Sequence, residues 1–154
     1  MDNISITSKA FKTGETIPAR HTCDGENLSP ALEWSQPPAE TVSFALISDD
    51  PDAPGGTFVH WIIFNISSDK TGLAEGVAKS EVLDDGSVQG TTSYGKSGYR
   101  GPCPPHGRPH RYFFKIYALD ANINLSASAT KAEVEAAMQG HILATGELIG
   151  LYGR

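Results

Sequence analysis

The amino-acid sequence predicts a mainly β fold, either a β-sandwich or a barrel-like sheet. Three apolar runs are rich in β-branched and aromatic residues, and each is bounded by Gly, Pro or Asp, a pattern typical of strands. A single segment late in the chain has the pattern of a helix. Runs of strands followed by one helix do not fit the alternation of strands and helices found in βαβ folds.

The predicted strands are of two kinds. The strongly patterned ones are 42–47, 58–66 and 111–119. Weaker patterns predict strands at 4–8, 31–34 and 147–152. The runs 58–66 and 111–119 are apolar on both faces, so we expect them to be central strands that are covered on both sides.

The predicted helix is short and begins at Thr130. Thr130 and Glu133 have the spacing of a capping box, in which each side chain bonds the other residue's backbone N–H. Val134, Ala137 and Met138 then form an apolar stripe, and Gly140 is a plausible stop.

Length and composition exclude several classes of protein. The 154 residues suffice for one domain with a real core, so we expect a single domain over 1–154. With 19% charged and 39% hydrophobic residues, the chain resembles neither a coiled coil nor a disordered protein. A net charge of -6 disfavours nucleic-acid binding. Two cysteines cannot build a disulfide-dense scaffold or a four-thiolate zinc site.

The sequence contains no recognisable targeting or membrane segment. Residues 1–5 lack the basic and apolar regions of a secretory signal. No apolar run approaches the roughly 20 residues that span a bilayer. The sequence also lacks an amphipathic basic helix that would bind a membrane surface, so we expect no stable membrane insertion. We therefore expect a cytoplasmic location.

Charge is unevenly distributed along the chain. Residues 86–119 contain no Asp or Glu but five basic residues, Lys96, Arg100, Arg108, Arg111 and Lys115, together with His106 and His110. A cationic, glycine-rich loop in an acidic protein is a candidate anion site, because backbone N–H groups and cationic side chains can converge there. On composition alone, a solvated basic loop that balances acidic neighbours is the simpler interpretation.

A second candidate set combines carboxylates with histidines. Asp50 and Asp52 flank Pro51, and residues two apart in an extended chain share a face. His60 lies inside an apolar strand, and His110 begins another in which Tyr112 shares its face. Taken singly, the aspartates fit a β-turn and each histidine fits a hydrogen-bonded core position. Together they form a more specific set, since a carboxylate can fix the tautomer and charge of a histidine.

Several familiar motifs fail in their context. Residues 90–97 match a phosphate-binding P-loop pattern, but a turn precedes them and a proline-rich segment follows, where that motif needs a strand and a helix. The segment that begins at Asp50 starts like a calcium-binding EF-hand loop, but it has Pro at the fifth position and Trp at the twelfth, where that loop needs Glu. The Gly-x-Ser-x-Gly turn of serine hydrolases is absent. A zinc or iron site built from two His and two Asp stays open, although the basic stretch beside His110 argues against it.

Several sequence blocks occur together in a specific order and spacing. They are Asp50-Pro51-Asp52-Ala53-Pro54, His60-Trp61, Gly101-Pro102, His110-Arg111-Tyr112 and Gly146-Glu147-Leu148-Ile149-Gly150. In these blocks the chain resembles the phosphatidylethanolamine-binding protein family over nearly its whole length. The segments 23–30 and 101–105, and the short C-terminus, resemble its bacterial and archaeal branch of Raf-kinase-inhibitor-like proteins.

This resemblance implies a two-sheet antiparallel β-sandwich with one or two short peripheral helices and a small anion pocket at one end. By matching position, the pocket residues are Asp50, Asp52, His60, Gly101, Pro102, His110 and Tyr112. The eukaryotic branch has two histidines where this chain has Val59-His60, and it has a longer C-terminal segment. These two departures argue against the eukaryotic kinase-inhibitor and flowering-signal roles for this chain.

A phosphoethanolamine head group, which carries both signs of charge, suits such a mixed pocket. We expect the basic stretch, a protonated His and backbone N–H groups near Gly101 to face the phosphate. Asp50 and Asp52 would then orient the histidines or receive the ammonium group.

Cys23 and Cys103 belong to the branch-specific segments, and Cys103 follows Gly101-Pro102 directly. In a reducing cytoplasm we expect two thiols. The alternative is a redox pair, a bridge between Cys23 and Cys103 that gates the pocket.

The resulting functional prediction is a binding protein rather than an enzyme, without a cofactor. Its ligand is a small phosphate-bearing group or a phosphorylated partner. The resemblance also allows inhibition of a kinase or a protease, because members of the family are described as inhibitors of both, and relatives suggest a homodimer. The alternative is a hydrolase that uses the Asp/His cluster as acid and base, with or without a metal.

Overall fold

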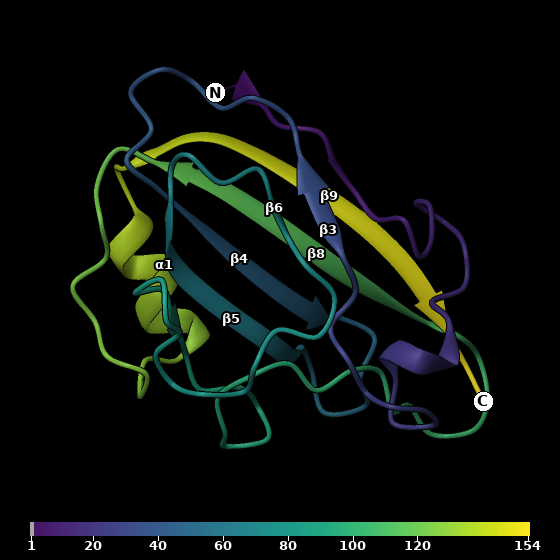
Figure 1. The fold of residues 1–154 in the computed structure, drawn as a ribbon. Helices are drawn as coiled ribbons and strands as arrows, with labels where there is room; N and C mark the ends of the chain where they lie inside the picture. The colour runs from purple at the N-terminus through teal and green to yellow at the C-terminus, as the bar shows by residue number, and fades with distance from the viewer. Residues whose placement is uncertain (1) are drawn as a thin grey trace.

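The computed structural model describes residues 2–154, and most of the strands predicted from the sequence are present in it. A six-stranded sheet has the order β1-β9-β8-β4-β5-β7, and a three-stranded sheet has the order β2-β3-β6. Every pair of neighbouring strands is antiparallel except β1 and β9. Figure 1 shows the long strands β9, β8, β4 and β5 side by side, with the smaller sheet across them. The prediction of a mainly β, two-sheet fold is confirmed.

The large sheet contains β1 (Asp2–Asn3), β4 (Ser43–Asp50), β5 (Phe58–Ser67), β7 (Val88–Gln89), β8 (His110–Leu119) and β9 (Ile142–Tyr152). The small sheet contains β2 (Ile6–Thr7), β3 (Leu32–Trp34) and β6 (Gly72–Leu73). The short strands β1, β6 and β7 had no signal in the sequence. Strand β9 begins five residues before the predicted segment, and its first half pairs with β8 although Ala144 and Gly146 have weak strand propensity.

Two hydrophobic cores cover opposite faces of the large sheet. One lies against the small sheet and includes Phe44, Leu46 and Trp34. The other lies against α1 (Lys131–Met138) and includes Ile47, Val134 and Met138 among others. Strand β4, between β8 and β5, is consequently buried at all eight positions.

The expectation that the runs 58–66 and 111–119 are covered on both sides is correct for β5 and only partly correct for β8. Strand β5 is buried at seven of its ten positions, including the consecutive residues 59–64. In β8, buried residues alternate with half-buried ones such as Phe113 and Lys115. The second face of β8 therefore remains partly open to solvent.

Helix α1 has the predicted boundaries and cap. Thr130 Oγ1 accepts a hydrogen bond from the backbone N–H of Glu133, whose carboxylate accepts one from the backbone N–H of Thr130. Gly140 follows with φ +83°, a left-handed conformation that suits glycine after a helix. A second, very short helix is the 3₁₀ turn η1 (Ala19–His21). Figure 1 shows α1 at the end of the sheet away from the C-terminus.

A β-bulge in β5 places His60. Ser48 of β4 pairs with Trp61, and the next residue, Asp49, pairs with Val59, so His60 has no partner in β4. Such a bulge can re-aim a side chain and often lies beside a functional site. Phe58 and His60 line a cavity, whereas Ile62, two residues further on, belongs to the core under α1.

Candidate functional site

A cavity of about 320 Å³ opens at one end of the large sheet. Strand β4 ends there while the antiparallel strands β5 and β8 begin there, so three strands contribute side chains to one place. Its lining is Asp50, Ala53, Pro54, Phe58, His60, Tyr94, Cys103, Pro104, Pro105, His110 and Tyr112. Two larger hollows lie along β8–β9 and along the small sheet, and neither has a histidine among its described lining residues.

The buried Asp50 and the half-buried His110 form a pair in this cavity. His110 Nδ1 lies 2.8 Å from Asp50 Oδ2, and the backbone N–H of Asp52 donates to Asp50 Oδ1 at 2.8 Å. Asp50 is 3% exposed. Since a carboxylate accepts hydrogen bonds, it holds a proton on His110 Nδ1 and leaves His110 Nε2 for a ligand.

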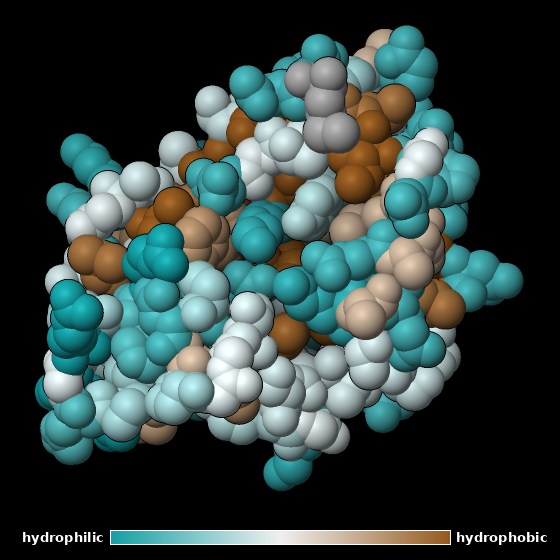
Figure 2. Space-filling model, turned by 180° about the vertical axis from the view of Figure 1, so that it is seen from behind, coloured by the Kyte–Doolittle hydropathy of each residue, from teal (hydrophilic) through white to brown (hydrophobic). Residues whose placement is uncertain are grey.

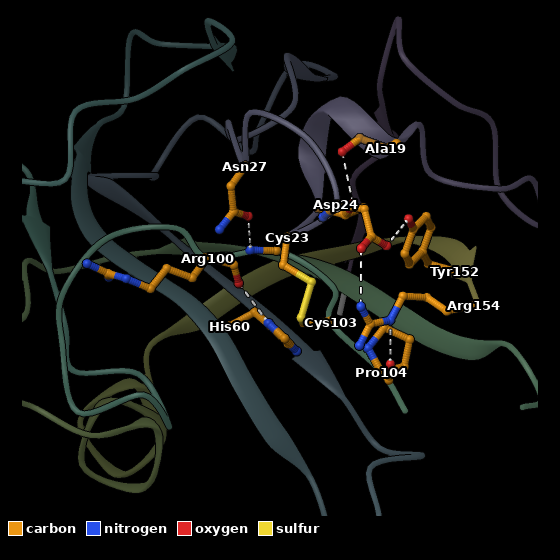
Figure 3. Close-up of a disulfide and its surroundings, with 12 residues drawn as sticks. Ala19, Cys23, Asp24, Asn27, His60, Arg100, Cys103, Pro104, Tyr152 and Arg154 are labelled. Carbon is orange, nitrogen blue, oxygen red and sulfur yellow. Dashed lines mark hydrogen bonds and ion pairs between the residues drawn. A yellow bond between two sulfur atoms is a disulfide. The ribbon is translucent and has the colours of Figure 1, made fainter. Parts of the chain in front are cut away.

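His60 is oriented by the protein backbone. Its Nδ1 donates to the carbonyl oxygen of Arg100 at 2.7 Å, as Figure 3 shows. Burial lowers the pKa of His60, and the Arg100 carbonyl and the Asp50 carboxylate oppose this only in part. A neutral His60 with its proton on Nδ1 presents the lone pair of Nε2 to the cavity.

Aromatic rings form much of the remaining lining. The rings of Phe58 and Tyr94 meet edge to face with centroids 4.8 Å apart, and those of His60 and Tyr112 with centroids 5.3 Å apart. Burial, and then the Asp50 carboxylate, raise the pKa of Tyr112 far above its usual value. Tyr112 therefore keeps its phenolic proton and can donate a hydrogen bond.

The sequence led us to expect Asp52 in the cavity, but Asp52 is not among the residues that line it. Arg111 donates to its carboxylate from Nε at 3.0 Å and from Nη2 at 2.9 Å, and the backbone N–H of Arg111 adds a third bond at 2.9 Å. These bonds lower the pKa of Asp52 to about 2. The alternation of an extended chain fails here because the chain enters a turn directly after Asp50.

Gly101 and Pro102 also lie outside the cavity lining. The backbone N–H of Gly101 donates to Asn27 Oδ1 at 2.8 Å, so this donor is already satisfied within the protein. A Cβ at Gly101 would collide with the carbonyl oxygen of His21, which explains the glycine. The carbonyl oxygen of Pro102 accepts a hydrogen bond from Cys23 N–H. Both residues position the wall of the cavity.

Cys23 and Cys103 are joined by a disulfide, with Cα atoms 5.4 Å apart (Figure 3). This differs from the expectation of two thiols, which was based on the cellular compartment rather than on geometry. Cys103 lines the cavity, and both half-cystines are exposed.

The basic stretch is only partly neutralised. Arg111 pairs with Asp52, and Lys115 lies 3.5 Å from Asp49, which Lys131 also contacts at 3.3 Å. Within residues 2–154, Lys96, Arg100 and Arg108 make no ion pair with a carboxylate. They lie in the loops that supply Tyr94 and Cys103–Pro105 to the cavity.

Sequence reasoning missed Phe58, Tyr94 and the proline wall Pro104–Pro105. Phe58 had a weak signal, since it stands two residues before His60 in the same strand. Tyr94 lies within the segment that was tested as a P-loop, and nothing in its neighbours indicates a cavity.

The side-chain clusters and the helices of residues 2–154 were compared with what a metal site or a membrane span requires. Among residues 2–154, no group of three or more His, Cys, Asp or Glu side chains is arranged to hold a metal ion. No helix in this range is long and apolar enough to cross a membrane. On the face shown in Figure 2, hydrophobic residues gather in small groups among hydrophilic ones.

The chain is similar to proteins of known family. The family described as "Phosphatidylethanolamine-binding protein" matches residues 7–153. A "UPF0098 protein" of Methanothermobacter thermautotrophicus is 53% identical over 98% of this chain and 99% of that protein. One from Aquifex aeolicus is 46% identical over 98% of this chain and 89% of that protein.

Two solved structures are similar in fold. A putative phosphatidylethanolamine-binding protein homolog, CT736 of Chlamydia trachomatis, is 40% identical, with a TM-score of 0.90 over 100% of this chain and 99% of that one. E. coli YbcL, described as a member of the mammalian PEBP family, is 36% identical, with a TM-score of 0.92 over 99% of both chains. The chain belongs to the phosphatidylethanolamine-binding protein family.

Proposed function

We propose that this protein binds a small ligand with a phosphate monoester group, such as a phosphoethanolamine head group, in the cavity between Asp50, His60 and His110. One observation carries the proposal. Both histidines have Nδ1 engaged within the protein, His60 by Arg100 and His110 by Asp50, while both rings line the same cavity. Two Nε2 atoms are thereby reserved for an occupant.

The proton arrangement suits a hydrogen phosphate group. Neutral His60 accepts a proton or a hydrogen bond from a P–OH group. His110 has its Nδ1 proton held by Asp50 and also presents Nε2 to the phosphate, where the protonated form of the ring donates to a phosphate oxygen. Tyr112 adds a hydroxyl donor. The charge of Asp50 is offset by its two hydrogen bonds, so it need not repel the ligand.

The surroundings favour an anion that carries an apolar part. The loops that line the cavity contain the unpaired cations Lys96, Arg100 and Arg108, which raise the local concentration of anions. The aromatic and proline lining offers apolar contact to the remainder of the ligand. A phosphorylated side chain of a partner protein carries the same chemistry, and inhibition of a kinase or a protease would follow from its capture.

A hydrolase is the alternative function. Among the described lining residues, Tyr94 and Tyr112 supply the hydroxyl groups and Cys103 is in a disulfide. Turnover would therefore rely on a water activated by a histidine. A phosphatase and esterase screen of the purified protein separates the two functions, and the binding proposal expects no turnover.

Titration with inorganic phosphate and with phosphoethanolamine, followed by the ring NMR signals of the histidines, tests the proposal. The signals of His60 and His110 should move together, whereas His141 should not. His141 is a matched control, because its Nδ1 lies 2.7 Å from Asp120 in a similar pair that is exposed to solvent.

Replacement of His110 by Gln should weaken phosphate binding by roughly 10- to 100-fold, the value of a hydrogen bond to a charged group. His141→Gln should leave it unchanged. Equal shifts at all three histidines, or none, would reject the cavity as the site.

A further inference from the structure

The Cys23–Cys103 disulfide is accessible and borders the cavity. It joins the turn that follows η1 to the loop before β8, 80 residues further along the chain. Both half-cystines are exposed, and Cys103 belongs to the cavity lining. Exposed disulfides exchange with thiols more readily than buried ones, and such bonds are often regulatory. The recognition of phosphate described above makes no use of the sulfur atoms.

The cavity wall, residues 103–105, has few other attachments. Pro104 and Pro105 have no backbone N–H and so cannot donate to a neighbouring strand. The carbonyl oxygen of Pro104 accepts a hydrogen bond from Arg154 Nε at 2.8 Å. The neighbouring carbonyl oxygen of Pro102 accepts one from Cys23 N–H at 3.1 Å. The disulfide is the covalent cross-link between this wall and the turn that contains Cys23.

The turn on the other side of the disulfide is firmly built. Thr22 Oγ1 donates to the Ala19 carbonyl and accepts from Asp24 N–H, while Gly25 N–H donates to the Thr22 carbonyl. Gly25 is closely packed, since a Cβ there would collide with the backbone of Ala19. When the disulfide opens, the mobile partner is therefore the wall rather than this turn.

The same turn also holds the wall by a second, ionic route. Asp24 accepts hydrogen bonds from Arg154 Nη1 at 3.1 Å and from Tyr152 Oη at 2.5 Å, and Arg154 in turn binds Pro104 (Figure 3). Adjacent residues, Cys23 and Asp24, thus hold one wall by a covalent bond and by a solvent-exposed ion pair. The ion pair alone is weak, so the disulfide dominates the position of the wall.

We propose that Cys23–Cys103 is a thiol–disulfide exchange site whose redox state sets the affinity of the cavity. The oxidised form holds residues 103–105 in place, and the reduced form releases them and weakens binding. This inference rests on the proposed function of the cavity and adds its regulation.

The reaction partner is a dithiol. One of its thiolates attacks a sulfur of the bridge, which breaks the S–S bond and forms a mixed disulfide. The second thiol of the reductant then displaces the remaining cysteine. Two electrons and two protons pass to Cys23 and Cys103, which become thiols, and the reductant becomes a disulfide.

The test compares the wild-type protein with its disulfide intact and after anaerobic reduction by dithiothreitol, so it does not depend on the folding of a variant. Hydrogen exchange is measured first without ligand. The Gly107 amide, which donates to the Arg154 carbonyl beside the wall, should exchange faster after reduction. The Ile63 amide in the buried centre of β5 should not change. Affinity for inorganic phosphate should fall about tenfold on reduction, a typical coupling between two sites.

The double variant Cys23→Ser/Cys103→Ser is the matched control. It should behave like the reduced protein, and dithiothreitol should not alter it further. Identical Gly107 exchange in the two redox forms would overturn the inference, as would equal phosphate affinity in both. If the oxidised protein does not bind phosphate at all, the proposed function fails, and the exchange of Gly107 still decides whether the disulfide controls the wall.

Discussion

Asp50 accepts a hydrogen bond from His110 at 2.8 Å within the cavity, and the same pairing recurs between Asp120 and His141 at 2.7 Å on an exposed part of the molecule. Geometry alone therefore does not distinguish a binding pair from a surface pair. Burial does, because Asp50 is 3% exposed and faces a cavity that also contains His60. The exposed pair is a natural control for the buried one.

Replacement of Asp50 by Asn should weaken phosphate binding about tenfold. Asp50 accepts hydrogen bonds at both oxygens, from Asp52 N–H and from His110, and an amide has only one oxygen to offer. Calorimetric titration with inorganic phosphate measures the change. Asp120→Asn should bind as the wild type does, and an unaltered affinity for Asp50→Asn would show that the pair does not contribute to recognition.

Protein stability should fall as the pH is lowered through the range below 6.5. Burial holds the pKa of His60 below its usual 6.5 in the folded protein. At pH values between the lowered pKa of His60 in the folded protein and 6.5, the unfolded chain binds more protons than the folded one. The free energy of unfolding therefore decreases as the pH falls through this range. In the His60→Asn variant, the side-chain amide does not titrate and can keep the hydrogen bond to the Arg100 carbonyl. The free energy of unfolding of this variant should therefore depend less on pH.

Thermal melts between pH 8 and pH 5 measure this effect for the wild type, for His60→Asn and for His141→Gln. The last variant should retain the full dependence of the wild type. If His60→Asn also retains it, then the titration of His60 is not its cause.

Replacement of Gly101 by Ala should lower the free energy of unfolding by about 3 kcal/mol, the upper part of the range for overpacked positions. A Cβ would collide there with the His21 carbonyl and crowd Tyr99 Oη at 2.8 Å, and both belong to a buried region. Gly55→Ala is the control, since a Cβ at Gly55 has no neighbour within 4 Å. Urea unfolding should separate the two variants clearly, and equal midpoints would contradict the packing described for Gly101.

Removal of the disulfide in Cys23→Ser/Cys103→Ser should lower the free energy of unfolding by about 4 kcal/mol, as expected for a loop of this length. The bridge spans 80 residues and limits the freedom of the unfolded chain. Urea unfolding with and without dithiothreitol measures the effect. The wild type should lose stability on addition of the reductant and the variant should not; a wild type that is insensitive to dithiothreitol would show that no disulfide forms.

The sequence was sufficient to predict most of the framework of the site. The long strands were recognised from their β-branched and aromatic residues, and His60, His110 and Tyr112 were assigned to them. The predicted segment 42–47 was three residues short of the end of β4, because Asp49 and Asp50 are polar. Those residues remain in the strand because Phe58, Val59 and Phe113 pair with them.

The errors concern residues whose role depends on the tertiary structure. Asp52 was placed in the pocket by its matching position in the family, and alternation gave it the same face as Asp50, but Arg111, 59 residues later, binds its carboxylate. Backbone N–H groups near Gly101 were expected to face the phosphate, but the N–H of Gly101 itself donates to Asn27, 74 residues earlier. Neither partner can be found from local spacing. The same holds for Tyr94, which reaches the cavity through a loop that has no periodic pattern.

Asp49 and Asp50 are consecutive residues of β4 whose carboxylates contact different parts of the protein. Asp49 lies near Lys131 at the start of α1, and Asp50 binds His110 in the cavity. Because side chains alternate along a strand, the insertion or deletion of one residue in β4 would exchange the two carboxylates between these surroundings. Natural variation in this strand should therefore proceed by substitution, with its length preserved even where its side chains change.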